Sequence, residues 1–146
     1  VVSTQSTGQI MIGMDKWDRL KDIAVKSPVA DVCFTDIDGY PMMSKMYVLQ
    51  SKHLGRFVVS CTKDSKKDVY AKAHPQQTWY FKCVQDYAQL FGNVEVLEFA
   101  GNEKVFLETF TEDLKKYSKT FDDPNRVLLV MNATKIVFPE KTEFIE

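Results

Sequence analysis

The sequence predicts an α+β fold in which about seven mostly antiparallel strands form a closed or nearly closed barrel with short flanking helices. Three observations predict it. Short apolar runs rich in β-branched residues recur along the chain, with turn signals between them. One of these turns, Asp38-Gly39, is the strongest hairpin signal of the sequence. Only short stretches with helical spacing interrupt the runs.

Composition narrows the class of protein. A chain of 146 residues, 45% of them hydrophobic, fits one domain, which we place at residues 10–146 after a loose polar tail at residues 1–9. Nineteen basic residues balance twenty acidic ones, which argues against a nucleic-acid partner held by phosphate neutralisation. No apolar run approaches the ~20 residues that span a bilayer, so no membrane partner is expected.

The cysteines and histidines do not predict a metal site. The three cysteines are widely spaced and lie in apolar runs, and neither histidine is near one of them in the sequence. Buried thiols in a reducing compartment are therefore expected, which makes the cytoplasm the expected location.

The elements follow in chain order. Apolar spacing predicts an amphipathic helix over residues 14–26, which Ser27-Pro28 ends. Shorter helical stretches are expected at residues 65–73 and from the N-cap Asn102 to about residue 118. Strands are expected at residues 29–37, 42–49, 56–61, 77–84, 87–99, 126–131 and 134–138. Gly92 predicts a bulge or bend, and Asn132-Ala133 is expected to join the last two strands.

The stretch at residues 57–68 predicts a strand, a polar turn and the start of a helix. Ser65 is followed three residues later by Asp68, as in a capping box. Lys66 and Lys67 then fall in the first helical turn, where the helix dipole disfavours cations unless an anion compensates them. Free N–H groups at such a terminus suit a phosphate. The alternative is two solvated surface lysines on a short helix.

The order of these motifs resembles the pyridoxamine 5′-phosphate oxidase-like family of flavin-binding split barrels over residues 17–140. The residues that carry the resemblance are Asp38, Gly39 and Pro41, then Thr62, Ser65, Lys66 and Lys67, then His74 and Pro75, before an aromatic strand and a long strand containing glycine. The Asp122-Asp123-Pro124-Asn125 turn and the apolar run after it are similar to the general stress protein branch of the family.

The resemblance implies flavin mononucleotide (FMN) bound at a homodimer interface, with a small-molecule redox partner. Ser65, Lys66 and Lys67 would hold the phosphate, although Lys66 lacks the bidentate fork of the family's arginine. Further positions match the family's cofactor site. They are Ser44, Lys45, Met46 and Tyr47 in the strand that lies along the ring, where a shift of one residue would change which side chains face it, the pair Ser60 and Cys61 before the phosphate turn, and either Gln85 or Tyr87 near the ring.

Two departures from the family bear on function. Ser44 stands where the pyridoxamine phosphate oxidases have an arginine, and residues 121–146 lack their late segment with arginine and histidine. Oxidation of pyridoxamine phosphate is therefore not expected. The expected function is an FMN-dependent oxidoreductase of unidentified substrate, in which no catalytic side chain is assigned because the flavin carries the chemistry.

Three alternatives remain. The barrel could hold a flavin or haem for carriage or sensing without turnover, or it could be a cofactor-free interaction protein, which Ser44 favours. A small barrel with aromatic strands could also bind single-stranded nucleic acid. The neutral charge balance makes that last reading the least favoured.

Overall fold

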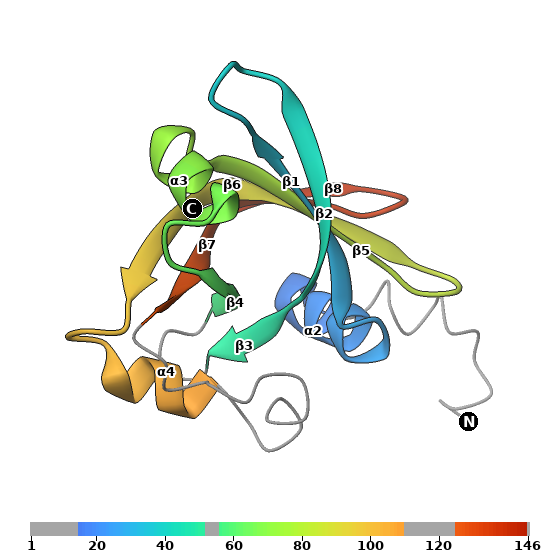
Figure 1. The fold of residues 1–146 in the computed structure, drawn as a ribbon. Helices are drawn as coiled ribbons and strands as arrows, with labels where there is room; N and C mark the ends of the chain where they lie inside the picture. The colour runs from blue at the N-terminus through green and yellow to red at the C-terminus, as the bar shows by residue number, and fades with distance from the viewer. Residues whose placement is uncertain (1–14, 52–55, 110–124, 146) are drawn as a thin grey trace.

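Eight strands form one curled antiparallel sheet in the computed structural model, which describes residues 15–51, 56–109 and 125–145 (Figure 1). The strands are β1 (Val29–Thr35), β2 (Pro41–Tyr47), β3 (Leu49–Ser51), β4 (Arg56–Thr62), β5 (Gln76–Lys82), β6 (Tyr87–Glu98), β7 (Arg126–Val137) and β8 (Thr142–Phe144). The helices are α2 (Lys16–Lys26), α3 (Lys66–Ala73) and α4 (Glu103–Thr109). The predicted α+β barrel is confirmed.

The sheet curls into a barrel because its two outer strands are consecutive in the chain. The strand order is β2-β1-β5-β6-β7-β4-β3, with β8 paired to β7. Only Val48 separates β2 from β3, so one bent segment pairs with β1 through its first part and with β4 through its second. The sheet thus encloses a core, as Figure 1 shows.

The hairpin between β1 and β2 forms as the Asp38-Gly39 signal predicts. The Asp36 carboxylate accepts hydrogen bonds from the backbone N–H groups of Asp38 at 2.9 Å and Tyr40 at 2.8 Å. Gly39 has φ +92°, a conformation that few residues other than glycine adopt. Both strands then pair in register from Val29 opposite Tyr47 to Thr35 opposite Pro41.

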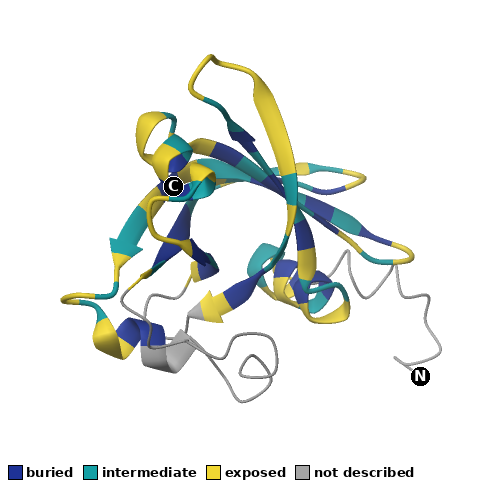
Figure 2. Cartoon of the chain, in the orientation of Figure 1, coloured by how far each residue is buried: buried dark blue, intermediate teal, exposed yellow. Residues whose placement is uncertain are grey.

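Two apolar clusters lie on the two faces of the sheet, and Figure 2 shows buried positions along most strands. The larger cluster fills the barrel, where Trp79 and Phe81 are completely buried. Helix α2 contributes Leu20 and Ile23 to it, and α3 contributes Ala71. The smaller cluster lies under α4 and is centred on Phe106, Val58, Leu128 and Val130. No helix in the described residues is long and apolar enough to cross a membrane.

A buried ion cluster joins α2 to two turns of the sheet. The Arg19 guanidinium donates to both Asp86 carboxylate oxygens, at 2.9 and 3.0 Å, and to the Glu140 carboxylate at 2.6 Å. It also lies 4.2 Å from the centre of the Phe138 ring. The hydrogen bond from Arg19 holds the pKa of Glu140 below its usual value. The cluster was not predicted, because its members lie far apart in the sequence.

The two last strands predicted from the sequence are one strand in the structure, and this prediction is wrong. β7 runs from Arg126 to Val137 without a break through Asn132 and Ala133, and its hairpin partner is β8. The register between the two strands shifts between Phe91 and Gly92 of β6, and the extra residue, Thr134, lies on β7. The bulge or bend predicted from Gly92 is therefore found as a register shift beside it, with the bulged residue on the partner strand.

Gly92 has no side chain because the β7 backbone occupies that space. A Cβ atom at this position would lie 2.1 Å from the Asn132 carbonyl oxygen and 2.7 Å from the Ala133 Cα atom. We expect Gly92→Ala to lower the free energy of unfolding by about 1–3 kcal/mol through overpacking, measured by urea denaturation. The neighbouring Asn93→Ala, at an exposed position, should change it by less than about 0.5 kcal/mol. Equal stabilities of the two variants would contradict the close approach.

Candidate functional site

The turn between β4 and α3 is held in place by hydrogen bonds at both of its sides. The Lys63 N–H donates to the Asn125 carbonyl oxygen at 2.7 Å, which ties the turn to the start of β7. The Asp64 N–H donates to the Asp68 carboxylate at 2.7 Å. Asp64 has φ +64°, the single positive φ among the described residues other than glycine. The start of α3 is therefore fixed relative to two strands.

Ser65 is the N-cap residue of α3, but the predicted capping box does not form. Its side chain makes no capping hydrogen bond, the Asp68 carboxylate accepts from the Asp64 N–H, and the Ser65 N–H donates to the Thr62 carbonyl oxygen. The Ser65 hydroxyl oxygen is buried and makes no hydrogen bond to an oxygen or nitrogen of the described residues, and its contact with the Cys61 thiol acts to lower the pKa of that thiol. The first N–H groups of a helix have no intrahelical acceptor. The helix thus begins with a buried hydroxyl and N–H donors that its own N-cap side chain leaves unpaired.

The two lysines of the first turn have no acidic partner among the described residues. Lys66 is exposed and Lys67 is half-buried. Asp68, the acid in the same turn, is completely buried and pairs with Lys72 at 3.1 Å. The positive charge at this helix start is therefore uncompensated by the described part of the chain, in the place where the helix dipole disfavours it.

A third cation, Arg126, begins β7 opposite the last residue of β4 and was not predicted from the sequence. Arg126 pairs with Thr62 across β7 and β4, and its Nε donates to the Ser60 hydroxyl at 3.0 Å. Burial raises the pKa of the Cys61 thiol, whereas the Ser65 hydroxyl, Arg126 and Lys67 act on the thiol in the opposite direction. By the register, Ser60 and Arg126 share the sheet face of Val58 and Leu128, whereas Cys61 lies on the face of the barrel core.

The strand predicted to lie along the flavin ring presents its residues on two faces. Ser44 and Met46 lie opposite Val32 and Ala30 on the side of the barrel core. Lys45 lies on the other face, where its ammonium is 3.3 Å from the Asp31 carboxylate. Tyr47 packs against the cluster under α4. One flat ring can therefore contact one pair of these residues through side chains, not all four.

The remaining candidates lie away from α3. Gln85 is exposed in the turn between β5 and β6, where the Cys83 N–H donates to the Asp86 carbonyl oxygen at 2.9 Å. Tyr87 follows it, with its ring centre 5.8 Å from that of Tyr80. In Figure 1 this turn lies on the right of the barrel and α3 on the left. One subunit does not bring these residues to the Ser65 hydroxyl.

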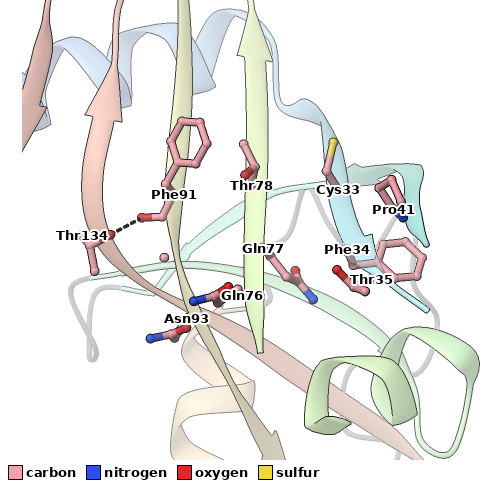
Figure 3. Close-up of a pocket in the computed structure, with 11 residues that line it drawn as sticks. Cys33, Phe34, Thr35, Pro41, Gln76, Gln77, Thr78, Phe91, Asn93 and Thr134 are labelled. Atoms are coloured by element: carbon pink, nitrogen blue, oxygen red, sulfur yellow. Dashed lines mark hydrogen bonds between the residues drawn. The ribbon is translucent and has the colours of Figure 1, made fainter. Parts of the chain in front are cut away.

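A groove of about 430 Å³ opens over β1, β5 and β6 (Figure 3). Its lining includes Cys33, Gln76, Thr78, Phe91 and Asn93. None of the residues proposed from the sequence for the cofactor lines it. Elsewhere in the described ranges, no three histidine, cysteine or acidic side chains are grouped so as to hold a metal ion.

Solved structures share this architecture. General Stress Protein 26 from Bacillus anthracis aligns with a TM-score of 0.75 and 17% identity, over 90% of this chain and 100% of its own. A pyridoxamine 5′-phosphate oxidase-related, FMN binding protein from Nostoc punctiforme aligns with a TM-score of 0.67 and 9% identity, over 86% and 85%. A heme binding protein from Mycobacterium smegmatis aligns with a TM-score of 0.70 and 12% identity, over 90% of this chain and 58% of its own.

The chain therefore has the split-barrel fold of general stress protein 26 and of the pyridoxamine 5′-phosphate oxidase-related proteins, as its motifs predict. No protein-family model and no curated protein sequence matches it. The shared fold does not identify the cofactor or the reaction of this chain, so both depend on the residues of the site.

Proposed function

We propose that the chain binds FMN, with the phosphate at the start of α3, and acts as an oxidoreductase on a small molecule that is not yet identified. One observation carries the proposal. Lys66 and Lys67 occupy a first helical turn without an acidic partner in the described residues, next to the buried hydroxyl of Ser65, which makes no hydrogen bond to an oxygen or nitrogen there. A phosphate would satisfy all three groups at once. The FMN binding protein of the same fold supports the choice of cofactor.

Each residue has a definite task in this proposal. The Ser65 hydroxyl and the N–H groups of the first turn donate to phosphate oxygens, and the two lysines neutralise its charge. The strand β2 offers Ser44 and Met46, or Lys45 and Tyr47, to one face of the ring. A bound flavin supplies the electron transfer, while the protein binds it and tunes its potential.

We further propose a homodimer with the cofactor at its interface. The outer face of β1 and β2 leaves Val29 and Met43 47% and 66% exposed. The turn between β5 and β6, which holds Gln85 and leads into Tyr87, lies on the side of the barrel away from α3. A second subunit could therefore bring its own copy of that turn to the flavin ring. The free cysteines Cys33, Cys61 and Cys83 fit a reducing compartment, and we place the protein in the cytoplasm.

Ligand-dependent stability tests the cofactor. FMN at about 100 times its dissociation constant should raise the free energy of unfolding by ~2.7 kcal/mol, read as a higher melting temperature. Riboflavin, which lacks the phosphate, should raise it less at the same concentration. Identical curves with and without FMN would contradict the proposal and favour the cofactor-free interaction protein.

Turnover separates the oxidoreductase from a binding module. A nicotinamide nucleotide should bleach the visible absorption of the bound flavin, and oxygen or another acceptor should restore it. Stable retention of flavin without bleaching by such donors would favour carriage or sensing. Haem is the second candidate ligand because a heme binding protein shares the fold, and a Soret band after incubation with haemin would favour it over FMN.

A further inference from the structure

The outer face of β1, β5 and β6 is unusually poor in charge. Cys33 lies opposite Thr78, and Thr78 lies opposite Phe91, so the three residues form a row across neighbouring strands over the groove (Figure 3). The residues between them along each strand face the barrel core. Among the described residues that line the groove, none is acidic or basic, although 27% of the chain is charged. A sheet face that stays in water normally carries charged side chains.

Charged side chains lie at the two sides of this face instead. On the side of β2, the Lys45 ammonium is 3.3 Å from the Asp31 carboxylate. On the side of β7, the Lys135 ammonium lies 4.8 Å from the centre of the Phe91 ring. An uncharged centre inside a charged rim is the usual anatomy of a protein–protein interface, whose core is depleted of charged residues.

A second copy of this chain fits the face without repulsion between like charges. Lys45 and Asp31 neutralise each other within one subunit, and the centre has no charge to oppose its own copy. The face continues onto β2, where Met43 lies opposite Cys33 and is 66% exposed. It is therefore continuous with the apolar surface on which the homodimer was proposed.

The symmetry of a dimer places this face at its centre. A homodimer usually has a two-fold axis, about which one patch contacts the same patch of the other copy. In the proposed dimer, β2 of one subunit meets the turn between β5 and β6 of its partner. The strands β1 and β5 lie between these two elements in the sheet. The outer face of β1 and β5 then lies on the axis.

We propose that the outer face of β1, β5 and β6 around Thr78 is the centre of the homodimer interface and is covered by the same face of a second copy. The inference rests on the proposed homodimer and names the surface that forms it. Each subunit then brings its turn between β5 and β6 to the flavin ring of the other, so the cofactor site is complete only in the dimer.

Sedimentation equilibrium of the purified full chain, without FMN and with excess FMN, measures the dissociation constant of the dimer. Thr78→Lys places like charges near the axis, in a surface that loses water on association, and should weaken the dimer about 100-fold or more. Gln76→Lys changes an exposed residue that lines the same groove. It should also weaken the dimer, and a single subunit accommodates it in water.

The matched control is Thr142→Lys, the same substitution at an exposed position of β8, which should leave the dissociation constant unchanged. Circular dichroism checks that each variant is folded. A dimer that Thr78→Lys and Gln76→Lys both leave intact would overturn this interface while leaving the homodimer in place. Equal weakening by Thr142→Lys would also overturn it, because the effect would then be one of net charge. A wild type that stays monomeric with and without FMN would remove the homodimer and this inference together, whereas FMN binding is read separately from the retained flavin spectrum.

Discussion

Arg19→Ala is expected to lower the free energy of unfolding by about 3–5 kcal/mol, the usual cost of breaking a buried ion pair by removing one partner. The Asp86 side chain is only 1% exposed and its two oxygens accept hydrogen bonds from Arg19. Without the guanidinium, this carboxylate stays buried without a counter-charge. Glu140 loses the same partner, but its side chain is 39% exposed and can hydrate. Urea denaturation of wild type and variant measures the difference.

Two variants make this result specific to the ion cluster. Lys21→Ala removes an exposed cation from the same helix and should change the stability by no more than about 0.5 kcal/mol. Arg19→Met combined with Asp86→Leu replaces both charges with apolar side chains, so it should recover most of the loss. A cost below about 1 kcal/mol for Arg19→Ala would contradict the uncompensated burial of Asp86.

The double variant Lys66→Ala/Lys67→Ala is expected to weaken FMN binding by roughly two to four orders of magnitude. Each lysine would make a charge-assisted hydrogen bond to the phosphate, and both bonds are lost. The apo protein should keep its melting temperature or gain slightly, because cations are disfavoured in a first helical turn. Fluorescence titration gives the affinity, and circular dichroism on heating gives the stability.

If FMN binding weakens while the melting temperature of the apo protein stays the same or rises, the two lysines serve anion binding and do not stabilise the free protein. The control Lys21→Ala/Lys104→Ala removes the same charge from exposed positions on α2 and α4 and should leave the affinity for FMN unchanged. If this control weakens binding as much, the effect is one of net charge. If the Lys66/Lys67 variant binds FMN as wild type does, the two lysines are solvated surface residues.

Local patterns were sufficient for most elements of the fold. The Asp38-Gly39 turn, the helix after Asp15 and the strands before α3 follow from side-chain periodicity and turn chemistry over a few residues. Their bounds in the structure differ from the prediction at some ends, since tertiary contacts decide where an element stops. The part of the predicted third helix beyond Thr109 lies outside the described residues.

Features that depend on pairing between distant strands could not be predicted in the same way. Asn132 and Ala133 resemble a connection locally, but both pair with β6, and β7 continues past them with one extra residue, Thr134. Arg19 meets Asp86 and Glu140 only through the tertiary fold. Arg126 reaches Ser60 because β7 pairs with β4, and that register is not visible in either segment alone.

The candidate site was predictable to the extent that it is local. Ser65, Lys66 and Lys67 are consecutive, so the sequence placed them at one helix start, and the structure does so too. The strand from Ser44 to Tyr47 was correctly expected as a strand, and its side chains alternate between the two faces of the sheet. Gln85 and Tyr87 were assigned by the resemblance alone, and within one subunit they lie apart from α3.

The most direct test of the central claim is the visible absorption spectrum of freshly purified protein, repeated after excess FMN is added and the unbound fraction is removed. The account predicts a retained flavin spectrum, with a stoichiometry of one FMN for each chain, and its loss in Lys66→Ala/Lys67→Ala. A folded wild-type protein that stays colourless after this treatment would contradict FMN binding and leave the barrel as a scaffold for interaction.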